Sequence, residues 1–440
     1  MRSRSRAFLW LLDKERRELV ASRSWWVLLL ALGPLVGISF ISAVRTYAEV
    51  SGLGGTAGGV GEAMAPLIGV WAPTFSACEL AAVFLLPFVA IRLVGGDRQS
   101  GALKLELQQG MPAAGLVAAK TIVLLIGWLI AMLPPFLAMA LWKSYGGTLY
   151  PPELGSVIAG HVINAGLTIA LGAAMAAVAE HPSTAAILTL GVTVGTWILN
   201  FFAAIQGGWW ERAAEYTPTA VVSEFQHGLV RLDVVLIAAL LVVAGLGYSA
   251  IWMRLGVATR RRAVESVGLA AAIAVAILAC TFVRGSWDLS EARANSFPEA
   301  DERALSGIHG LRIEVHLAPE DPRRVELENR ALAKLRRLMP DLRVDYKSAT
   351  SIGIFEQANA GYGEIWYFLN GKKEMSRTTT AEGVLEAIYA VSGVSPPKDE
   401  DVEFRGHPLS AQPRGAALVF FGIWPGLVLL AAFVTRRRRL

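Results

Sequence analysis

The clearest pattern along the chain is a series of eight apolar runs, each about 20 residues or longer, separated by polar stretches. Crossing ~30 Å of hydrocarbon takes roughly 20 apolar residues in a helix, because the backbone must satisfy its own hydrogen bonds there. Each run therefore predicts a membrane-spanning helix. The predicted spans are 25–44, 73–94, 116–141, 155–179, 184–204, 233–253, 264–283 and 416–435.

Residues 284–414, between the last two runs, follow a different pattern. Residues 310–318 and 342–349 alternate apolar and polar positions, as half-buried strands do. Between them, residues 321–339 predict a helix. Its apolar positions at helical spacing are Val325, Leu332, Leu335 and Leu338. A strand, helix and strand of this length predict parallel strands joined by a right-handed crossover.

The rest of this segment carries turn and helix signals. Asn370-Gly371 separates two strand-like runs and is the strongest short signal for a hairpin. Residues 380–393 predict a closing helix, and the Pro-rich, charged residues 394–413 predict an extended linker. Residues 51–64, which are rich in glycine, predict a flexible loop rather than a dinucleotide fingerprint, since no strand precedes them.

Composition agrees with a polytopic α-helical membrane protein that carries an α/β domain. The 440 residues are 54% hydrophobic and 18% charged, and the mean hydropathy is +0.47. Segment 284–414 holds 18 Lys plus Arg against 21 Asp plus Glu, a net charge of −3, which predicts a soluble domain. The charged N-terminus lacks a small-residue cleavage site after its first apolar run, so we expect that span to be retained.

The distribution of basic residues predicts the orientation, because basic loops remain on the cytoplasmic side. We expect a multi-pass protein of the cytoplasmic (inner) membrane with both termini in the cytoplasm and residues 284–414 outside it. The basic residues that this places inside are Arg2, Arg4, Arg6, Lys14, Arg16, Arg17, Arg23, Arg98, Lys104, Arg254, Arg260 to Arg262 and Arg436 to Arg439. Because these charges are dispersed beside spans, we favour lipid over nucleic acid as their partner.

Catalytic motifs are not found in the sequence. The only Gly-Lys pair, Gly371-Lys372, lies in the predicted hairpin and does not belong to a phosphate-binding loop. The histidines have no metal-ligand spacing, and the serine in residues 247–250 has no histidine on the neighbouring span to act as its base. Cys78 and Cys280 lie in predicted spans, where we expect them to act as small apolar side chains that pack between helices. We therefore expect no catalytic residue, metal site or cofactor in this chain.

Ionisable groups inside spans are costly in lipid and normally face protein or water. Glu79 either lines a substrate path or lies near the headgroups, and Lys120 is explained by snorkelling to the interface. His161 and Asn164 share one face of the fourth span, which favours hydrogen bonds between helices over transport chemistry. Aromatic residues before the sixth span are either interface anchors or a substrate gate; they include Trp209 and Trp210.

Two stretches resemble the ABC-2 type permeases, which are the membrane subunits of ABC exporters. The first is "LDKERRELVASRSWWVLLL", which resembles the family's amphipathic elbow helix at Lys14, Glu15 and Arg23. The second is "DRQSGALKLEL", which resembles the family's cytoplasmic coupling element, with Lys120 at the family's distance beyond it. Its matching residues are Asp97, Arg98, Ser100, Gly101 and Leu103. The resemblance covers about residues 7–253.

This resemblance implies a coupling helix at about 97–110, including Glu106, that docks on a separate ABC ATPase subunit. ATP and magnesium would be bound by that partner, and a second permease chain, identical or related, would complete the pathway. Alternation in "LKLEL" by itself predicts a strand, so the helix rests on the resemblance. The elbow is expected in the inner membrane interface. Its side chains toward lipid would be Phe8, Leu11, Leu12 and Leu19.

Three residues depart from the family's pattern in the coupling element. Ala102 replaces the usual Thr, Lys104 stands where Glu is common, and Gly110 lies near the family's Pro. Lys104 reverses a charge on the expected docking surface, so the ATPase would carry a matching change.

Segment 287–393 is similar to the auxiliary extracytoplasmic domain of gliding-motility-type ABC systems, in "WDLSEARANSF" and "EGVLEAIYAV" as well as the β-α-β stretch. The expected organisation is an elbow at 1–24, a six-span core at 25–253, a basic loop and seventh span at 254–283, the α/β domain at 284–414, and an eighth span with a basic tail at 415–440. The expected function is export driven by a partner's ATPase. The alternative is an envelope scaffold or signalling protein that transports nothing.

Overall fold

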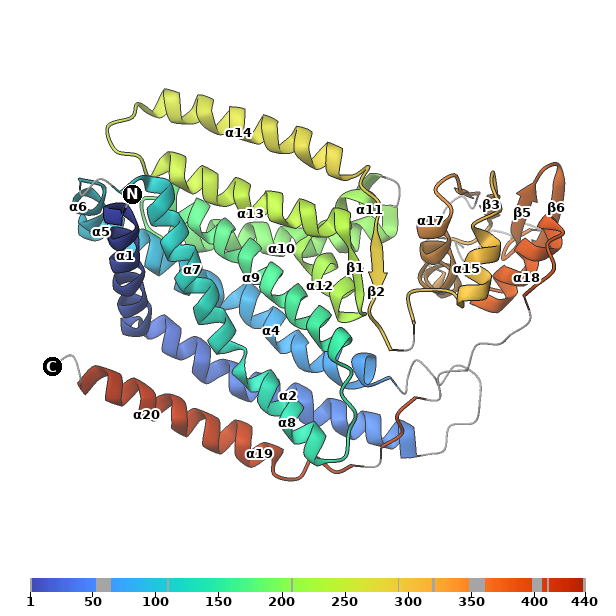
Figure 1. Ribbon diagram of the computed structural model, residues 1–440, viewed down its shortest axis with the longest axis horizontal. Coiled ribbons are helices and arrows are strands. Elements are labelled where there is room, and N and C mark those ends of the chain that lie inside the picture. The colour runs from blue at the N-terminus through green and yellow to red at the C-terminus, as the bar shows by residue number, and fades with distance from the viewer. Residues whose placement is uncertain are drawn as a thin grey trace, which may run out of the picture. The chain divides into compact units, whose positions relative to one another are not determined.

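The computed structural model describes residues 2–52, 65–108, 111–206, 209–291, 293–318, 321–347, 361–397, 406–409 and 411–437 (Figure 1). It divides the chain into two compact units. The membrane unit consists of Met1–Asn200, Ala213–Ala292 and Arg405–Leu440, and the α/β unit of Phe201–Arg212 and Arg293–Phe404. Most of the glycine-rich loop expected at 51–64, and the middle of the linker expected at 394–413, lie outside the described residues.

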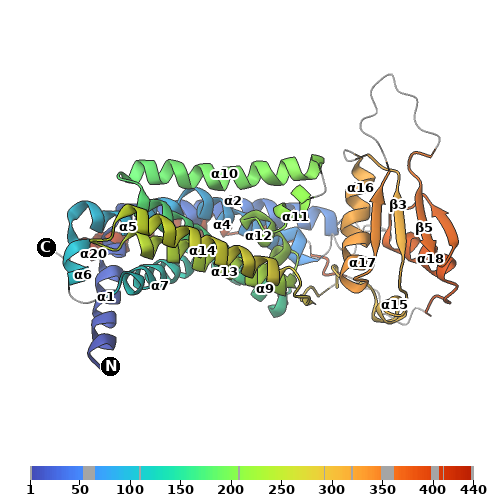
Figure 2. The ribbon, with the colours of Figure 1, turned by 90° about the horizontal axis from the view of Figure 1, so that it is seen from above.

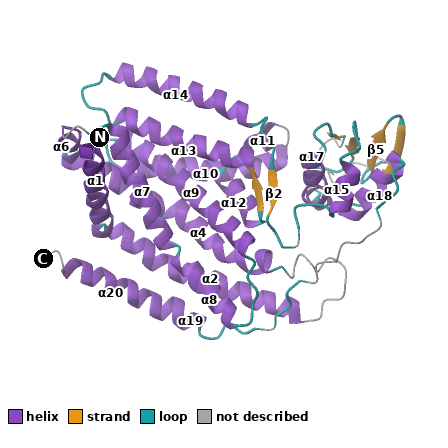
Figure 3. Ribbon diagram, viewed as in Figure 1, coloured by secondary structure: helices purple, strands orange, loops and turns teal. Residues whose placement is uncertain are grey.

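Eight helical segments among the described residues are long and apolar enough to cross a membrane, which confirms the eight predicted runs as helices (Figure 3). They are Arg23–Ser51, Leu67–Asp97, Ala113–Ser144, Pro151–Val178, Pro182–Ala203, Leu232–Trp252, Thr259–Cys280 and Ala416–Arg437. The chain is therefore a polytopic helical protein by length and composition of its helices.

Prolines divide two of these segments into consecutive helices. The second segment contains α4 (Ala72–Phe84) and α5 (Leu86–Ser100), and Pro87 lies in the first turn of α5. The third contains α7 (Ala113–Ala131) and α8 (Leu133–Ser144), with Pro134 and Pro135 at the start of α8. A proline supplies no backbone N–H and clashes with the preceding turn, so it begins a new helix instead of continuing the old one.

α9 (Pro151–Val178) is the most buried of the eight segments and packs against α5, α12 (Pro218–Gln226) and α13 (Leu232–Trp252). Glycines permit the close approach of these helices. A Cβ at Gly160 would lie 2.5 Å from Phe225 of α12, and one at Gly245 would lie 2.9 Å from a backbone oxygen of α9. Small residues at such contacts are typical of helix packing in membranes.

Polar contacts anchor the two connections that flank the α/β unit. Before it, the Glu291 N–H donates to Glu153 Oε1 at the start of α9, at 2.6 Å. After it, His407 Nε2 lies 2.9 Å from Glu291 Oε2, and the Tyr47 hydroxyl at the end of α2 (Arg23–Gly52) donates to the His407 carbonyl at 2.6 Å. The chain therefore leaves the membrane unit and returns to it at neighbouring points.

The α/β unit contains a four-stranded sheet in the order β4-β3-β5-β6. The strands are β3 (Arg312–Val315), β4 (Arg343–Tyr346), β5 (Ile365–Leu369) and β6 (Lys372–Ser376). β3 and β4 are parallel, as the β-α-β pattern predicts, and the other pairs are antiparallel. Figure 2 shows the sheet with the helices beside it. They are α15 (Glu299–Leu305), α16 (Pro322–Leu327), α17 (Ala333–Leu338) and α18 (Ala381–Ser392).

Local sequence predicts the turn of this sheet correctly and one core position wrongly. Asn370 and Gly371 form the two-residue hairpin with positive φ angles of 50° and 80°, which Asn and Gly tolerate best. Val325 is 55% exposed, although helical spacing places it in the core. The crossover helix widens into a π turn at Glu328–Leu332, and the shifted register buries Leu327 instead.

Candidate functional site

Helix α1 (Arg2–Ala21) lies at the same end of the membrane unit as α5 and α6 (Figures 1 and 2). It packs on α7, and Leu19 is buried to 4% exposure, with Leu12 against the same core. The prediction that Leu19 faces lipid is therefore wrong, whereas Leu12 is only partly buried. The apolar stripe of α1 is used by the protein bundle, whereas Leu9 and Trp10 are exposed.

The stretch that resembles the coupling element folds as two helices with a break between them. Asp97 and Ser100 belong to the end of α5, Gly101 adopts a left-handed φ of +78°, and α6 spans Ala102–Gln108. The alternating pattern of this stretch, which by itself predicts a strand, is overridden. Leu103 is buried, whereas Leu105 is 64% exposed, so α6 has one face on the protein and one open face.

Five charged side chains meet where α1, α5, α6 and α7 converge, and we call them the ionic junction. They are Lys14, Glu15, Asp97, Glu106 and Lys120. Their sequence positions are far apart, so this meeting is a product of the tertiary fold.

Lys120 of α7 lies at the centre of the junction and is 1% exposed. Its Nζ donates to Glu15 Oε2 at 2.7 Å, to the Leu93 carbonyl at 2.9 Å, and to Asp97 Oδ2. All three ammonium hydrogens thus have acceptors. The sequence predicts that Lys120 snorkels to the membrane interface. That prediction is wrong, because the ammonium group is buried against the carboxylates of Glu15 and Asp97.

Lys14 of α1 connects the junction to α6. Its Nζ lies 3.1 Å from Asp97 Oδ2 and 3.2 Å from Glu15 Oε1, and it also pairs with Glu106. Burial opposes its charge, but Glu106, Glu15 and Asp97 outweigh that effect and raise the pKa of Lys14. This ammonium therefore stays charged while it joins α1, α5 and α6.

The junction holds three carboxylates and two ammonium groups. Burial raises the pKa of Glu15 against the opposing effect of Lys120. Oxygens of Glu15, Asp97 and Glu106 lie within 4.8 Å of one another, a spacing at which a metal ion binds elsewhere. Since the two lysines already supply the cations at these oxygens, we assign no metal to them.

Other residues of the predicted docking set lie around this junction. The Ser100 hydroxyl accepts the Ala102 N–H at 3.4 Å across the break between α5 and α6. Arg23 begins α2 and is exposed, outside the ionic junction. Arg98 belongs to α5, but its side chain lies outside the described set.

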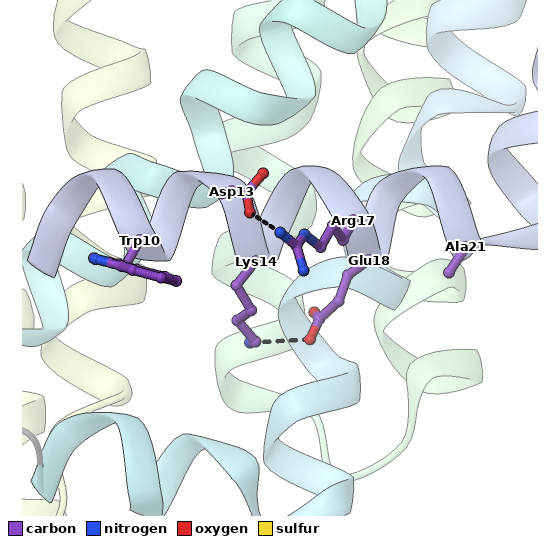
Figure 4. Close-up of a pocket in the computed structure, with 6 residues that line it drawn as sticks. All are labelled: Trp10, Asp13, Lys14, Arg17, Glu18 and Ala21. Carbon is purple, nitrogen blue, oxygen red and sulfur yellow. Dashed lines mark ion pairs between the residues drawn. The ribbon is translucent and has the colours of Figure 1, made fainter. Parts of the chain in front are cut away.

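A shallow pocket of about 280 Å³ runs along the outer face of α1 (Figure 4). It is lined by Trp10, Asp13, Lys14, Arg17, Glu18 and Ala21. Two ion pairs, each between residues one turn apart, order this face: Arg17 with Asp13 at 2.6 Å and Lys14 with Glu18 at 3.1 Å. Because Lys14 also belongs to the ionic junction, the exposed face of α1 is connected directly to the buried charges.

The residues predicted for a substrate path belong to different units of the structure. Glu79 is half-buried in α4 of the membrane unit and lies close to Thr219. Trp209 and Trp210 are assigned to the α/β unit, where their ring centroids lie 3.8 Å apart and Trp210 meets Phe202 at 5.2 Å. Trp209 is 64% exposed.

Comparison with models of protein families, with curated proteins and with solved structures finds no match to this chain.

Proposed function

We propose that the chain is the membrane-spanning permease subunit of an ABC-2 type exporter, driven by ATP hydrolysis on a separate subunit. The observation that carries this proposal is the ionic junction. It connects the element resembling the elbow helix, through Lys14 and Glu15, with the element resembling the coupling helix, through Asp97 and Glu106.

Such a connection suits the transmission of force. Removing one partner of a buried charge pair costs ~3–5 kcal/mol, so the four helices at the junction resist separate movement. A push on the open face of α6 would therefore reach α5 and α7 together. The left-handed Gly101 lets α6 turn away from α5 and present Leu105 and Lys104 outward.

The proposed partners follow from this role. An ABC ATPase subunit would bind the open face of α6 and carry the ATP and magnesium. A second permease chain, identical or related, would share the pathway. α10 (Pro182–Gln206) supports this second chain, because a Cβ added at Gly191 or Gly195 would meet no other atom within 4 Å, and small residues at this spacing allow close helix pairs.

Purification of the tagged chain in mild detergent from its native membrane tests the proposal. We expect a protein with Walker motifs to copurify, together with vanadate-sensitive ATPase activity. Leu105→Glu should abolish copurification, because it places a charge on the docking face of α6. Leu255→Glu is the matched control, since Leu255 is also exposed and lies in the basic loop predicted on the same side.

Two outcomes contradict this proposal. If no ATPase copurifies from membranes in which other ABC complexes survive, the chain is not an exporter subunit, and a scaffold that transports nothing takes its place. If both glutamate variants lose the ATPase equally, α6 is not the docking element.

A further inference from the structure

A second buried polar group lies inside the membrane unit, away from the ionic junction. It consists of His161 and Asn164 of α9 with Gln226 of α12, and we call it the polar seam. His161 is 0% exposed and Asn164 is 1% exposed. The Phe75 ring of α4 stacks on His161 at 5.3 Å between centroids, so three helices enclose the histidine.

The hydrogen bonding of the polar seam is incomplete among the described residues. Gln226 Nε2 lies 3.2 Å from His161 Nε2. His161 Nδ1 and both amide atoms of Asn164 are buried and have no protein partner within the described parts of the chain. Within a membrane bundle water is scarce, and each unsatisfied polar group costs several kcal/mol.

Other polar side chains of α9 do not share this defect. Ser156, also buried, donates to the Phe225 carbonyl at 2.9 Å, and Glu153 accepts the Glu291 N–H. Within α9, the buried side-chain atoms without a partner among the described residues are therefore only those of His161 and Asn164.

The unpaired atoms define the chemistry of what would satisfy them. With the Gln226 amide oriented as in the structure, its nitrogen donates to His161 Nε2, and this assignment places the hydrogen of the ring on His161 Nδ1. Asn164 adds donors at Nδ2 and an acceptor at Oδ1. Residues three apart on a helix are neighbours, and the Asn164 side chain leans toward the turn that holds His161.

A hydroxyl oxygen complements this set, because it accepts two hydrogen bonds and donates one. We propose that His161 and Asn164 form a binding site for a hydroxyl oxygen between α4, α9 and α12. The hydroxyl comes either from water or from the exported molecule, and the second source rests on the proposed export function.

The position of the site favours a role on a polar path. Glu79 lies one turn along α4 from Phe75 and reaches Thr219 of α12, the helix that also supplies Gln226. Polar side chains thus continue from the seam between the same two helices. Intramembrane polar groups arranged in this way mark substrate or ion pathways in other membrane proteins.

The direction of the stability change in Asn164→Leu tests the site without any knowledge of the substrate. If a hydroxyl is bound, the variant removes its contacts and lowers the melting temperature by about 2–4 °C. If the amide is buried with nothing bound, an apolar side chain of similar size raises the melting temperature, and the proposal fails. Ser156→Ala is the matched control, because it removes one satisfied hydrogen bond from the same helix and must lower stability in either case.

A titration distinguishes the two sources of the hydroxyl. Octyl glucoside, a hydroxyl-rich amphiphile, is added to the wild type and to Asn164→Leu, both held in hydroxyl-free lauryldimethylamine oxide. Both assignments require that Asn164→Leu melts at a lower temperature than the wild type. If octyl glucoside then raises the melting temperature of the wild type but not of Asn164→Leu, the site binds the hydroxyl of an amphiphile. If octyl glucoside changes both melting temperatures equally, the site binds water. Neither measurement uses ATPase activity, so failure of the exporter proposal and failure of this site are separate results.

Discussion

Removing a charged side chain of the ionic junction should cost more free energy of unfolding than removing a surface charge. Lys120 and Glu15 are buried. Arg16, which follows Glu15 on α1 and pairs with Asp13, has a side chain that is 64% exposed. An exposed pair is screened by water and contributes little. A buried one leaves an uncompensated charge when either partner is removed.

Lys120→Met should therefore destabilise the protein by about 3–5 kcal/mol, because Glu15 and Asp97 would remain buried without their cation. Thermal unfolding in detergent measures this loss. Adding Glu15→Gln to Lys120→Met should recover part of it. Arg16→Ala is the control and should leave the melting temperature unchanged. A Lys120→Met protein as stable as the wild type would mean that the junction is hydrated.

Glu224 gives the membrane unit a pH dependence. Burial raises its pKa to about 7, against the attraction of Arg231, which lies 2.9 Å away. Between the ordinary glutamate pKa of ~4.3 and about 7, the folded protein thus holds a proton that the unfolded chain has released. The contribution to stability is greatest below this window and falls as the pH rises through it.

Melting temperatures measured across that pH window should accordingly fall with rising pH in the wild type and fall less in Glu224→Gln. Glu299→Gln removes an exposed carboxylate and serves as the control, with the slope of the wild type. An unchanged slope in Glu224→Gln would show that Arg231 keeps this carboxylate ionised.

At the scale of elements, the break between α5 and α6 depends on one backbone conformation. Gly101 has a φ of +78°, where a side chain costs ~1–2 kcal/mol. Gly96 lies within the helical part of α5, and a Cβ at this position would have no atom within 4 Å. The same substitution should therefore act in opposite directions at these two glycines.

Gly101→Ala should lower the free energy of unfolding by about 1 kcal/mol, and Gly96→Ala should raise it by a similar amount. Thermal unfolding of the two variants measures both effects. Gly101→Ala should also weaken ATPase copurification, because α6 is reoriented. If both variants are stabilised, α5 continues through residue 101 as one helix.

Helices and turns could be predicted from the sequence where the properties of neighbouring residues determine them. The eight runs became helices because hydrocarbon length and apolar content are local properties, and Asn370-Gly371 formed its turn because both residues tolerate positive φ. α6 was different, since its alternation favours a strand whereas the structure folds it as a helix. Val325 was misplaced because a π turn cannot be read from spacing alone.

At the scale of the whole molecule, the orientation predicted from basic residues can be measured directly. Single cysteines at Ser306 and Thr259, both exposed, are introduced after Cys78 and Cys280 are replaced by Ala. A membrane-impermeant maleimide should label Ser306→Cys in intact cells and Thr259→Cys only after permeabilisation. The reverse result would place the α/β unit in the cytoplasm.

The sequence by itself determined the membrane class, the eight helices, the β-α-β unit and its hairpin, since each depends on the composition or spacing of neighbouring residues. It also singled out Lys14, Glu15, Asp97 and Glu106, through their resemblance to the elbow and coupling elements of ABC-2 type permeases. Only the tertiary structure decided that these four meet around a buried Lys120, and that Leu19 of α1 faces protein instead of lipid. The partners are separated by up to 105 residues, and local periodicity carries no information about which distant charge will neutralise a buried one.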